Sequence, residues 1–197
     1  MNDAPIVGFR TWLITTHEPD LKSVAMNHVW PKQQDVIAKC MRNVGFMKHP
    51  SDEPEPKINL EHEPPTEGCQ CGLYARTTLD GVKDEYPYYP VHGYWAYMRP
   101  TNAGLMIMGA VLMWGTVHRG GKVIKAARAR VLCLTDIENP WVERTGSNNP
   151  ASVPEERREE RKQTVNMIAE AYGVPIIPYA STTMYASEFG DLTPKPE

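Results

Sequence analysis

Two cysteines that stand two positions apart, Cys69 and Cys71, have a glycine on each side. These glycines allow the backbone to turn tightly enough for both thiolates to reach one metal ion. His62 lies seven residues before Cys69, and Cys40 lies further upstream. Three sulfurs and one imidazole make up the Cys₃His ligand set that holds structural Zn²⁺ without an open coordination position. The sequence therefore predicts a structural zinc site formed by Cys40, His62, Cys69 and Cys71.

The cysteines leave other interpretations open. His49 could complete the site in place of His62, and the thiols could instead be metal-free and buried as small hydrophobic side chains. A disulfide or redox pair is the third interpretation, although four cysteines in 197 residues are too few and too unevenly placed for a disulfide scaffold. Cys133 lies in an apolar strand pattern, and we expect it to be buried in the core.

The segment 50–68, which leads into the cysteine pair, has an unusual composition. It holds five prolines and six acidic residues against one lysine. Such a segment cannot build its own core, so the composition predicts an extended loop. A metal ion bound at Cys69 and Cys71 would tie this loop down, because metal-binding energy then contributes to folding.

Alternating and apolar patterns predict a sheet. Residues 6–14 and 73–79 alternate as half-buried strands do, and Asp80-Gly81 suggests a turn. The apolar run 105–117, a turn at 118–121 and the return 122–134 predict a hairpin. In the return strand we expect Ala127, Ala129, Val131 and Cys133 on one face, and Arg128, Arg130 and Leu132 on the other.

Two segments have helical spacing. Apolar residues over 33–44 predict a short helix with Cys40 on its buried face. Residues 154–172 follow a capping signal, carry an apolar stripe and end at Gly173, which predicts an amphipathic helix packed on the sheet. The fold class is therefore α+β and mostly β: a small barrel or curled antiparallel sheet with two packed helices and a metal-tied loop.

The length of 197 residues fits about one domain. We expect a single zinc-stapled β-rich domain over 1–177, with the loop at 50–68, a linker at 138–153 and the second helix at 154–172. Residues 178–197 are expected to form a C-terminal arm or tail. A composition of 41 % hydrophobic and 23 % charged residues excludes wholesale disorder and collagen.

The net charge of −3 conceals an uneven distribution. Residues 86–135 contain six basic residues and no acidic one, whereas 50–68 sums to −5. A basic hairpin could contact a partner or a phosphate backbone, with tyrosines as stacking platforms. Its candidate residues are Arg119, Lys122, Lys125, Arg128, Arg130, Tyr88 and Tyr89. The alternative is that these cations form a solvated strand face and that the tyrosines pack over a barrel mouth.

Several classes of function lack their signatures. The first twenty residues lack the pattern of a secretory signal, and the longest apolar run is too short for a membrane helix, so we expect a cytoplasmic protein. No nucleophile elbow, Walker loop, dinucleotide fingerprint or zinc-protease motif is present. Cys40 or Cys71 could act as a nucleophile with His62 or His92 as base, but a thiol cannot be both a closed zinc ligand and a free nucleophile.

Seven short blocks carry a family resemblance. They are Gly8-Phe-Arg-Thr-Trp12, Ala38-Lys-Cys40, His62-Glu-Pro-Pro65, Cys69-Gln-Cys-Gly-Leu-Tyr-Ala75, Trp114-Gly-Thr-Val117, Lys125-Ala126 and Tyr172-Gly-Val-Pro175. In these blocks the chain resembles a family of small proteins of actinobacteria and their bacteriophages. The chain departs from the family pattern after Gly121, where Val123-Ile124 replaces an aromatic residue.

The resemblance implies an actinobacterial or phage origin and His62 rather than His49 as the ligand. It implies no particular activity. Together with the residues it suggests a non-catalytic accessory or regulatory binding protein, phage-encoded, that engages a host protein or nucleic acid through the basic hairpin. The alternative function is a small enzyme that acts on a nucleotide or another phosphorylated ligand.

Overall fold

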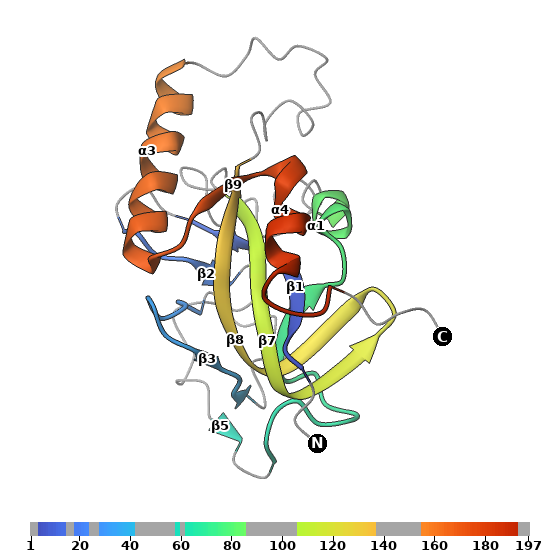
Figure 1. The fold of residues 1–197 in the computed structure, drawn as a ribbon. Coiled ribbons are helices and arrows are strands. Elements are labelled where there is room, and N and C mark those ends of the chain that lie inside the picture. The colour runs from blue at the N-terminus through green and yellow to red at the C-terminus, as the bar shows by residue number, and fades with distance from the viewer. Residues whose placement is uncertain are drawn as a thin grey trace.

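A computed structural model describes residues 4–14, 18–23, 28–41, 58–59, 62–85, 106–136 and 155–192. The strands in this part are β1 (Ile6–Leu13), β2 (Lys22–Ser23), β3 (Val36–Ile37), β4 (Cys40–Met41), β5 (Ile58–Asn59), β6 (Leu73–Arg76), β7 (Met106–Gly120), β8 (Val123–Asp136) and β9 (Ile176–Pro178). The helices are α1 (Leu79–Glu85), α3 (Glu155–Tyr172) and α4 (Tyr179–Ser187). Figure 1 shows α1 and α4 beside the long β7–β8 hairpin and α3 standing at its other side.

The strands form one curled sheet. The sheet has seven strands. Five of them lie in the order β2-β1-β6-β8-β3, β7 pairs with both β1 and β8, and β9 pairs with β8. Four of these strands are therefore hydrogen-bonded in a closed ring: β1 to β7, β7 to β8, β8 to β6, and β6 back to β1. All named pairs are antiparallel except β8–β9, and β4 and β5 make a separate small sheet. This arrangement confirms the predicted α+β fold with a curled, mostly antiparallel sheet.

The predicted hairpin is the longest pairing in the described part of the chain. Strands β7 and β8 pair from Met108 and Thr135 down to Gly120 and Val123. The reversal uses Gly121 and Lys122, and Gly121 has a φ of 56°, a left-handed value that favours glycine. The turn therefore lies at the end of the predicted 118–121 segment.

The register of the hairpin shifts twice, between Ala110 and Val111 and between Trp114 and Val117. An unpaired residue at a bulge moves the following side chains to the other face. As a result Val131 belongs to one hydrophobic cluster and Cys133 to the other. The prediction that these two share a face is therefore wrong, whereas the predicted burial of Cys133 is confirmed, because it is fully buried.

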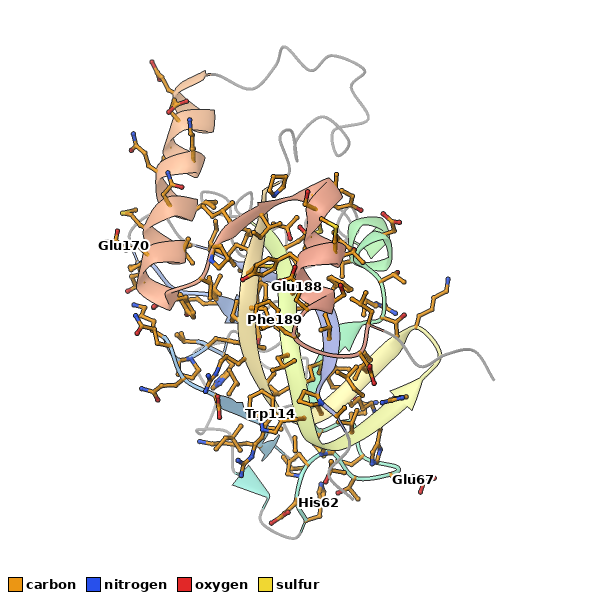
Figure 2. The ribbon with its side chains drawn as sticks, viewed as in Figure 1. His62, Glu67, Trp114, Glu170, Glu188 and Phe189 are labelled. Atoms are coloured by element: carbon orange, nitrogen blue, oxygen red, sulfur yellow. The ribbon has the colours of Figure 1, made fainter. Side chains whose placement is uncertain are left out.

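Two hydrophobic clusters cover the two faces of the sheet. One includes Trp12 and Trp30 and packs against Ile168 of α3. The other includes Phe9 of β1 and Ala186 of α4. Figure 2 shows side chains filling the space between the sheet and the helices, and it labels Glu170 on α3 and Phe189 just after α4.

The predicted helix over 154–172 is confirmed as α3. It ends at Gly173, which has a φ of 64°. Its last residue, Tyr172, is buried, and its hydroxyl donates to the Trp30 carbonyl at 2.7 Å and accepts from the Leu21 N–H at 2.9 Å. Tyr172 therefore ties α3 to the segment that leads into β3.

The predicted helix over 33–44 is wrong. Residues 36–37 form β3, which pairs with β8, and Cys40 lies in β4. Val36 is buried while Ile37 is 57 % exposed, as a strand with one buried face requires. Backbone groups of β8 supply the hydrogen bonds that a helix would have made internally, and the Ala38 N–H also donates to the Ala127 carbonyl at 2.8 Å.

Two further predictions are wrong, because short helices form where a turn and a C-terminal arm were expected. Asp80-Gly81 lies inside α1, and the start of the expected C-terminal arm forms α4. Thr182 and Ala186 of α4 are fully buried, and the Thr182 hydroxyl lies 3.1 Å from that of Thr135 on β8. The predicted linker at 138–153 lies outside the described residues.

Removing the Tyr172 hydroxyl should destabilise the fold. Tyr172→Phe leaves the buried Leu21 N–H and Trp30 carbonyl without their partner, which costs about 1–3 kcal/mol in the free energy of unfolding. Denaturant titration measures this loss. Tyr185→Phe is the control, because its hydroxyl makes no hydrogen bond with described residues. Equal stability of the two variants would contradict the expected role of Tyr172.

Candidate metal centre

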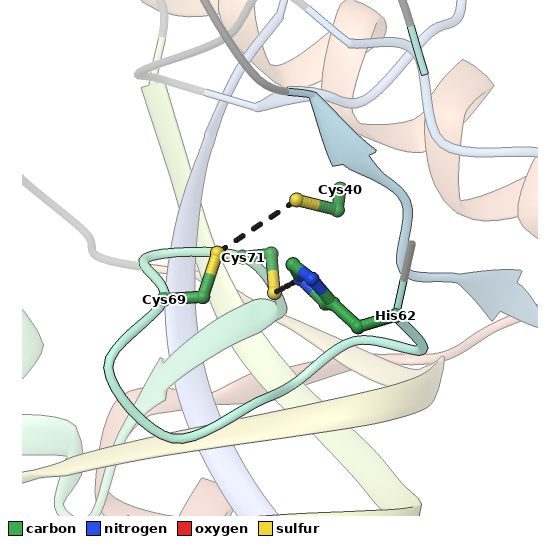
Figure 3. A group of neighbouring side chains, drawn as sticks. All are labelled: Cys40, His62, Cys69 and Cys71. Carbon is green, nitrogen blue, oxygen red and sulfur yellow. Dashed lines mark hydrogen bonds between the residues drawn. The ribbon is translucent and has the colours of Figure 1, made fainter. Parts of the chain in front are cut away.

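Strands β3 and β4, which form where a helix was predicted, determine the position of Cys40. Strand β3 is held on β8, and two residues later Cys40 pairs with Asn59 in the β4–β5 sheet. Only 3 % of Cys40 is exposed. Its thiol therefore lies inside the protein and faces the loop that carries the other cysteines (Figure 3).

The loop from His62 to Gly72 brings the other donors to the same place. The Cys69 N–H donates to the Thr66 carbonyl at 3.1 Å, and the Thr66 hydroxyl donates to the Glu63 carbonyl at 2.7 Å. Gly72 has a φ of 125°, a conformation open to glycine alone, and β6 begins immediately after it. The expectation that glycine allows the tight turn of the cysteine pair is met here.

The four predicted ligands meet in space. The sulfurs of Cys40 and Cys69 are 3.7 Å apart, and His62 Nε2 lies 3.3 Å from the Cys71 sulfur (Figure 3). All four donor atoms lie within 4.8 Å of one another. A tetrahedral site with metal–sulfur bonds of about 2.3 Å has sulfur–sulfur edges of about 3.8 Å. The tetrad therefore has the spacing that a metal ion needs.

Hydrogen bonding and burial give the thiols different acidities. A backbone N–H bond from Cys71 lowers the pKa of Cys69 to about 7. Burial raises the pKa of Cys40 to about 11 and also raises the pKa of Cys71. Since metal ligands must be thiolates, binding of a divalent ion would release protons from this cluster.

Lys125 of β8 supports the cysteine loop. Its ammonium donates to the Cys69 carbonyl at 3.3 Å and lies 5.3 Å from the centre of the Tyr74 ring, which stands opposite it on β6. The Tyr74 hydroxyl donates to the Gln70 carbonyl in the same loop. A divalent ion with three thiolates carries one net negative charge, so the ammonium is placed to offset it.

The five described basic residues of the predicted binding surface have different surroundings. Lys125 is engaged by the cysteine loop, and Arg130 donates from Nε to Asp35 at 2.7 Å. Arg119 stands opposite Ile124, whose side chain faces the interior cluster, so Arg119 lies on the other face of the hairpin from Lys125. The five cations therefore do not form one continuous stripe.

Arg119, Lys122 and Arg128 remain exposed cations. Tyr88, Tyr89, His49 and His92 lie outside the described residues.

The contact between Lys125 and the cysteine loop was not expected from the sequence. It depends on the pairing of β6 with β8, two strands about fifty residues apart. The alternation in β8 could indicate only that Lys125 points away from the core.

Comparisons with known proteins give no further assignment: no family model, no curated protein and no solved structure matches the chain. The resemblance to actinobacterial and phage proteins thus stays a prediction. Among the described residues no helix has the length and apolar character needed to cross a bilayer.

Replacing Lys125 should weaken metal binding without preventing folding. In Lys125→Met the ammonium that offsets the cluster charge is lost, and we expect the affinity for a thiolate-binding divalent ion to fall about tenfold. Competition with a chromogenic chelator measures this affinity. Lys122→Met, in the exposed turn, should bind the ion as wild type does, and an equal affinity in both variants would show that Lys125 has no such role.

Proposed function

We propose that this chain is a non-catalytic binding protein whose Cys40, His62, Cys69 and Cys71 hold a structural zinc ion. The convergence of four donor atoms from two distant segments supports this most directly. Three thiolates and an imidazole favour Zn²⁺ over the harder Mg²⁺ and Ca²⁺ ions. Four protein ligands leave no coordination position for substrate, which is typical of structural sites.

The local structure around the tetrad favours a structural rather than a catalytic ion. Strands β4 and β5 have two residues each, and the stretch from His62 to Gly72 contains neither helix nor strand. Such segments have few backbone hydrogen bonds of their own. A bound ion would join the end of β3 to the start of β6 and stabilise both.

A protein partner fits the exposed surface better than a nucleic acid does. Arg128 is exposed on β8, and its neighbour Ile37 is 57 % exposed on β3, the last strand in the sheet order. A large apolar side chain beside cations on an edge strand is typical of protein interfaces. We therefore propose a partner with an acidic surface, and on the family resemblance a host protein bound by a phage-encoded one.

The zinc proposal predicts one equivalent of zinc in protein purified under reducing conditions. Cys69→Ser with Cys71→Ser should abolish it, whereas Cys133→Ser should retain it because Cys133 lies apart from the tetrad. Loss of the ion should cost about 3–4 kcal/mol, similar to the loss of a cross-link, and lower Tm by roughly 10 °C. Elemental analysis and thermal unfolding measure both. Less than about a tenth of an equivalent in folded wild-type protein excludes the site.

The partner proposal predicts that Ile37→Asp with Arg128→Glu loses a host protein that the wild-type chain retains in a pull-down. The control is Lys162→Glu, on the exposed side of α3. Binding to mixed DNA and RNA oligonucleotides should be weak at low salt. A steep negative dependence of oligonucleotide affinity on salt would instead indicate phosphate-backbone contacts and would replace the protein partner with a nucleic acid.

A further inference from the structure

Arg10 of β1 points into the interior cluster rather than to solvent. It alternates with Gly8 and Trp12 on the face of β1 that this cluster covers. Its guanidinium carbon lies 4.4 Å from the ring centre of Trp30 and 5.6 Å from that of Trp12. Both indoles are fully buried, whereas part of Arg10 reaches solvent. Arg10 is therefore a partly exposed residue whose guanidinium, with a buried Nε, packs against an aromatic cluster.

This guanidinium has no acidic partner among the described residues. An Nη atom of Arg10 donates to the Ser23 hydroxyl at 3.4 Å, and that hydroxyl already accepts from Trp30 Nε1 at 3.0 Å. Arg10 Nε and Trp12 Nε1 are both buried and have no hydrogen-bond partner within the described ranges. A buried donor without a partner, above all a charged one, is costly, and native structures seldom leave one unsatisfied.

Two further basic residues, His28 and Lys39, belong to the electrostatic surroundings of Arg10. Burial lowers the pKa of Arg10 to about 9, and no carboxylate among the described residues counters this effect. Partial burial, together with the positive charges of Lys39 and Arg10, lowers the pKa of His28. His28 and Lys39 are both exposed. His28 therefore lies within electrostatic reach of both Arg10 and Lys39.

The aromatic cluster holds Arg10 in a fixed position. Trp12 and Trp30 pack edge to face, with ring centres 5.4 Å apart and planes at 85°. The Trp30 N–H donates to the Leu21 carbonyl at 2.9 Å, and Tyr172 binds the Trp30 carbonyl. A guanidinium stacked on a fixed indole loses little conformational freedom when it binds a ligand.

We propose that Arg10 binds the phosphate group of a small ligand, to which the exposed His28 and Lys39 contribute positive charge. The planar guanidinium matches phosphate oxygens with paired donors, and a phosphate is close to dianionic at neutral pH. The positive charge of three basic groups matches the nearly double negative charge of a phosphate better than the single negative charge of a carboxylate. The site uses none of the proposed zinc ligands and would bind a small phosphorylated molecule rather than a protein, so it goes beyond the proposed binding function.

The test is a titration with inorganic phosphate at constant ionic strength, followed by tryptophan fluorescence and by Tm. Trp12 and Trp30 flank Arg10, so we expect a saturable fluorescence change and a rise in Tm. Arg10→Met should reduce the affinity about tenfold or more, since charge-assisted hydrogen bonds are lost. Arg10→Lys should also bind more weakly, because an ammonium cannot form the paired contact.

Two controls distinguish phosphate binding at Arg10 from a nonspecific effect of surface charge and from a loss of folding. Lys162→Met removes an exposed cation on α3, outside both proposed sites, and should leave phosphate affinity unchanged. Arg10→Met without phosphate should unfold at a Tm no lower than wild type, because an uncompensated buried cation is removed. A nucleoside monophosphate and O-phosphoserine, titrated in the same way, show which class of molecule carries the phosphate. Equal phosphate affinity in wild type and Arg10→Met, or binding of acetate as tight as that of phosphate, would overturn the proposal.

Discussion

Strand β8 is the element on which the rest of the structure depends. One of its edges is occupied by β7 along almost the whole hairpin, and the other edge pairs in succession with β6, β3 and β9. Three segments from distant parts of the chain are therefore ordered by one row of backbone groups. Because β3 leads to Cys40 and β6 follows Cys71, adjacent pairings on this edge bring the cysteines together. The tetrad is a consequence of β8 pairing as much as of its own residues.

The sequence was most informative where the chemistry is local. The spacing of Cys69 and Cys71, their glycines and the nearby His62 predicted three donors that the structure places within reach of one ion, and Cys40 completed the set. The helix expected over 33–44 failed for a non-local reason. Its apolar spacing also fits two short strands, and the unpaired edge of β8, about ninety residues away, decides between the alternatives. No pattern within the segment shows that this edge is available.

The same limit applies to surface charge. Alternation in β8 predicted exposed arginines correctly, but Arg130 is paired with Asp35, 95 residues earlier, and Lys125 with the cysteine loop. Two bulges then changed which residues share a face, so that Val131 and Cys133 point to opposite clusters. Net charge along a strand therefore overestimates the charge that a partner meets. Arg10 is the opposite case. Its place in a strand pattern gave no sign that it packs against Trp12 and Trp30 with no acidic partner among the described residues.

The proposed metal and phosphate sites share one segment of backbone. Cys40 lies in β4 and Lys39 stands directly before it, while β3 leads to both from the edge of β8. An ion at the tetrad would restrict the backbone at Cys40, and a phosphate near Arg10 would restrict Lys39. When one ligand has already ordered a segment, a second ligand that needs the same order meets a smaller entropic cost. If both ligands bind, the two sites would be coupled through the residues between Val36 and Met41, and by thermodynamic reciprocity each ligand would strengthen the binding of the other.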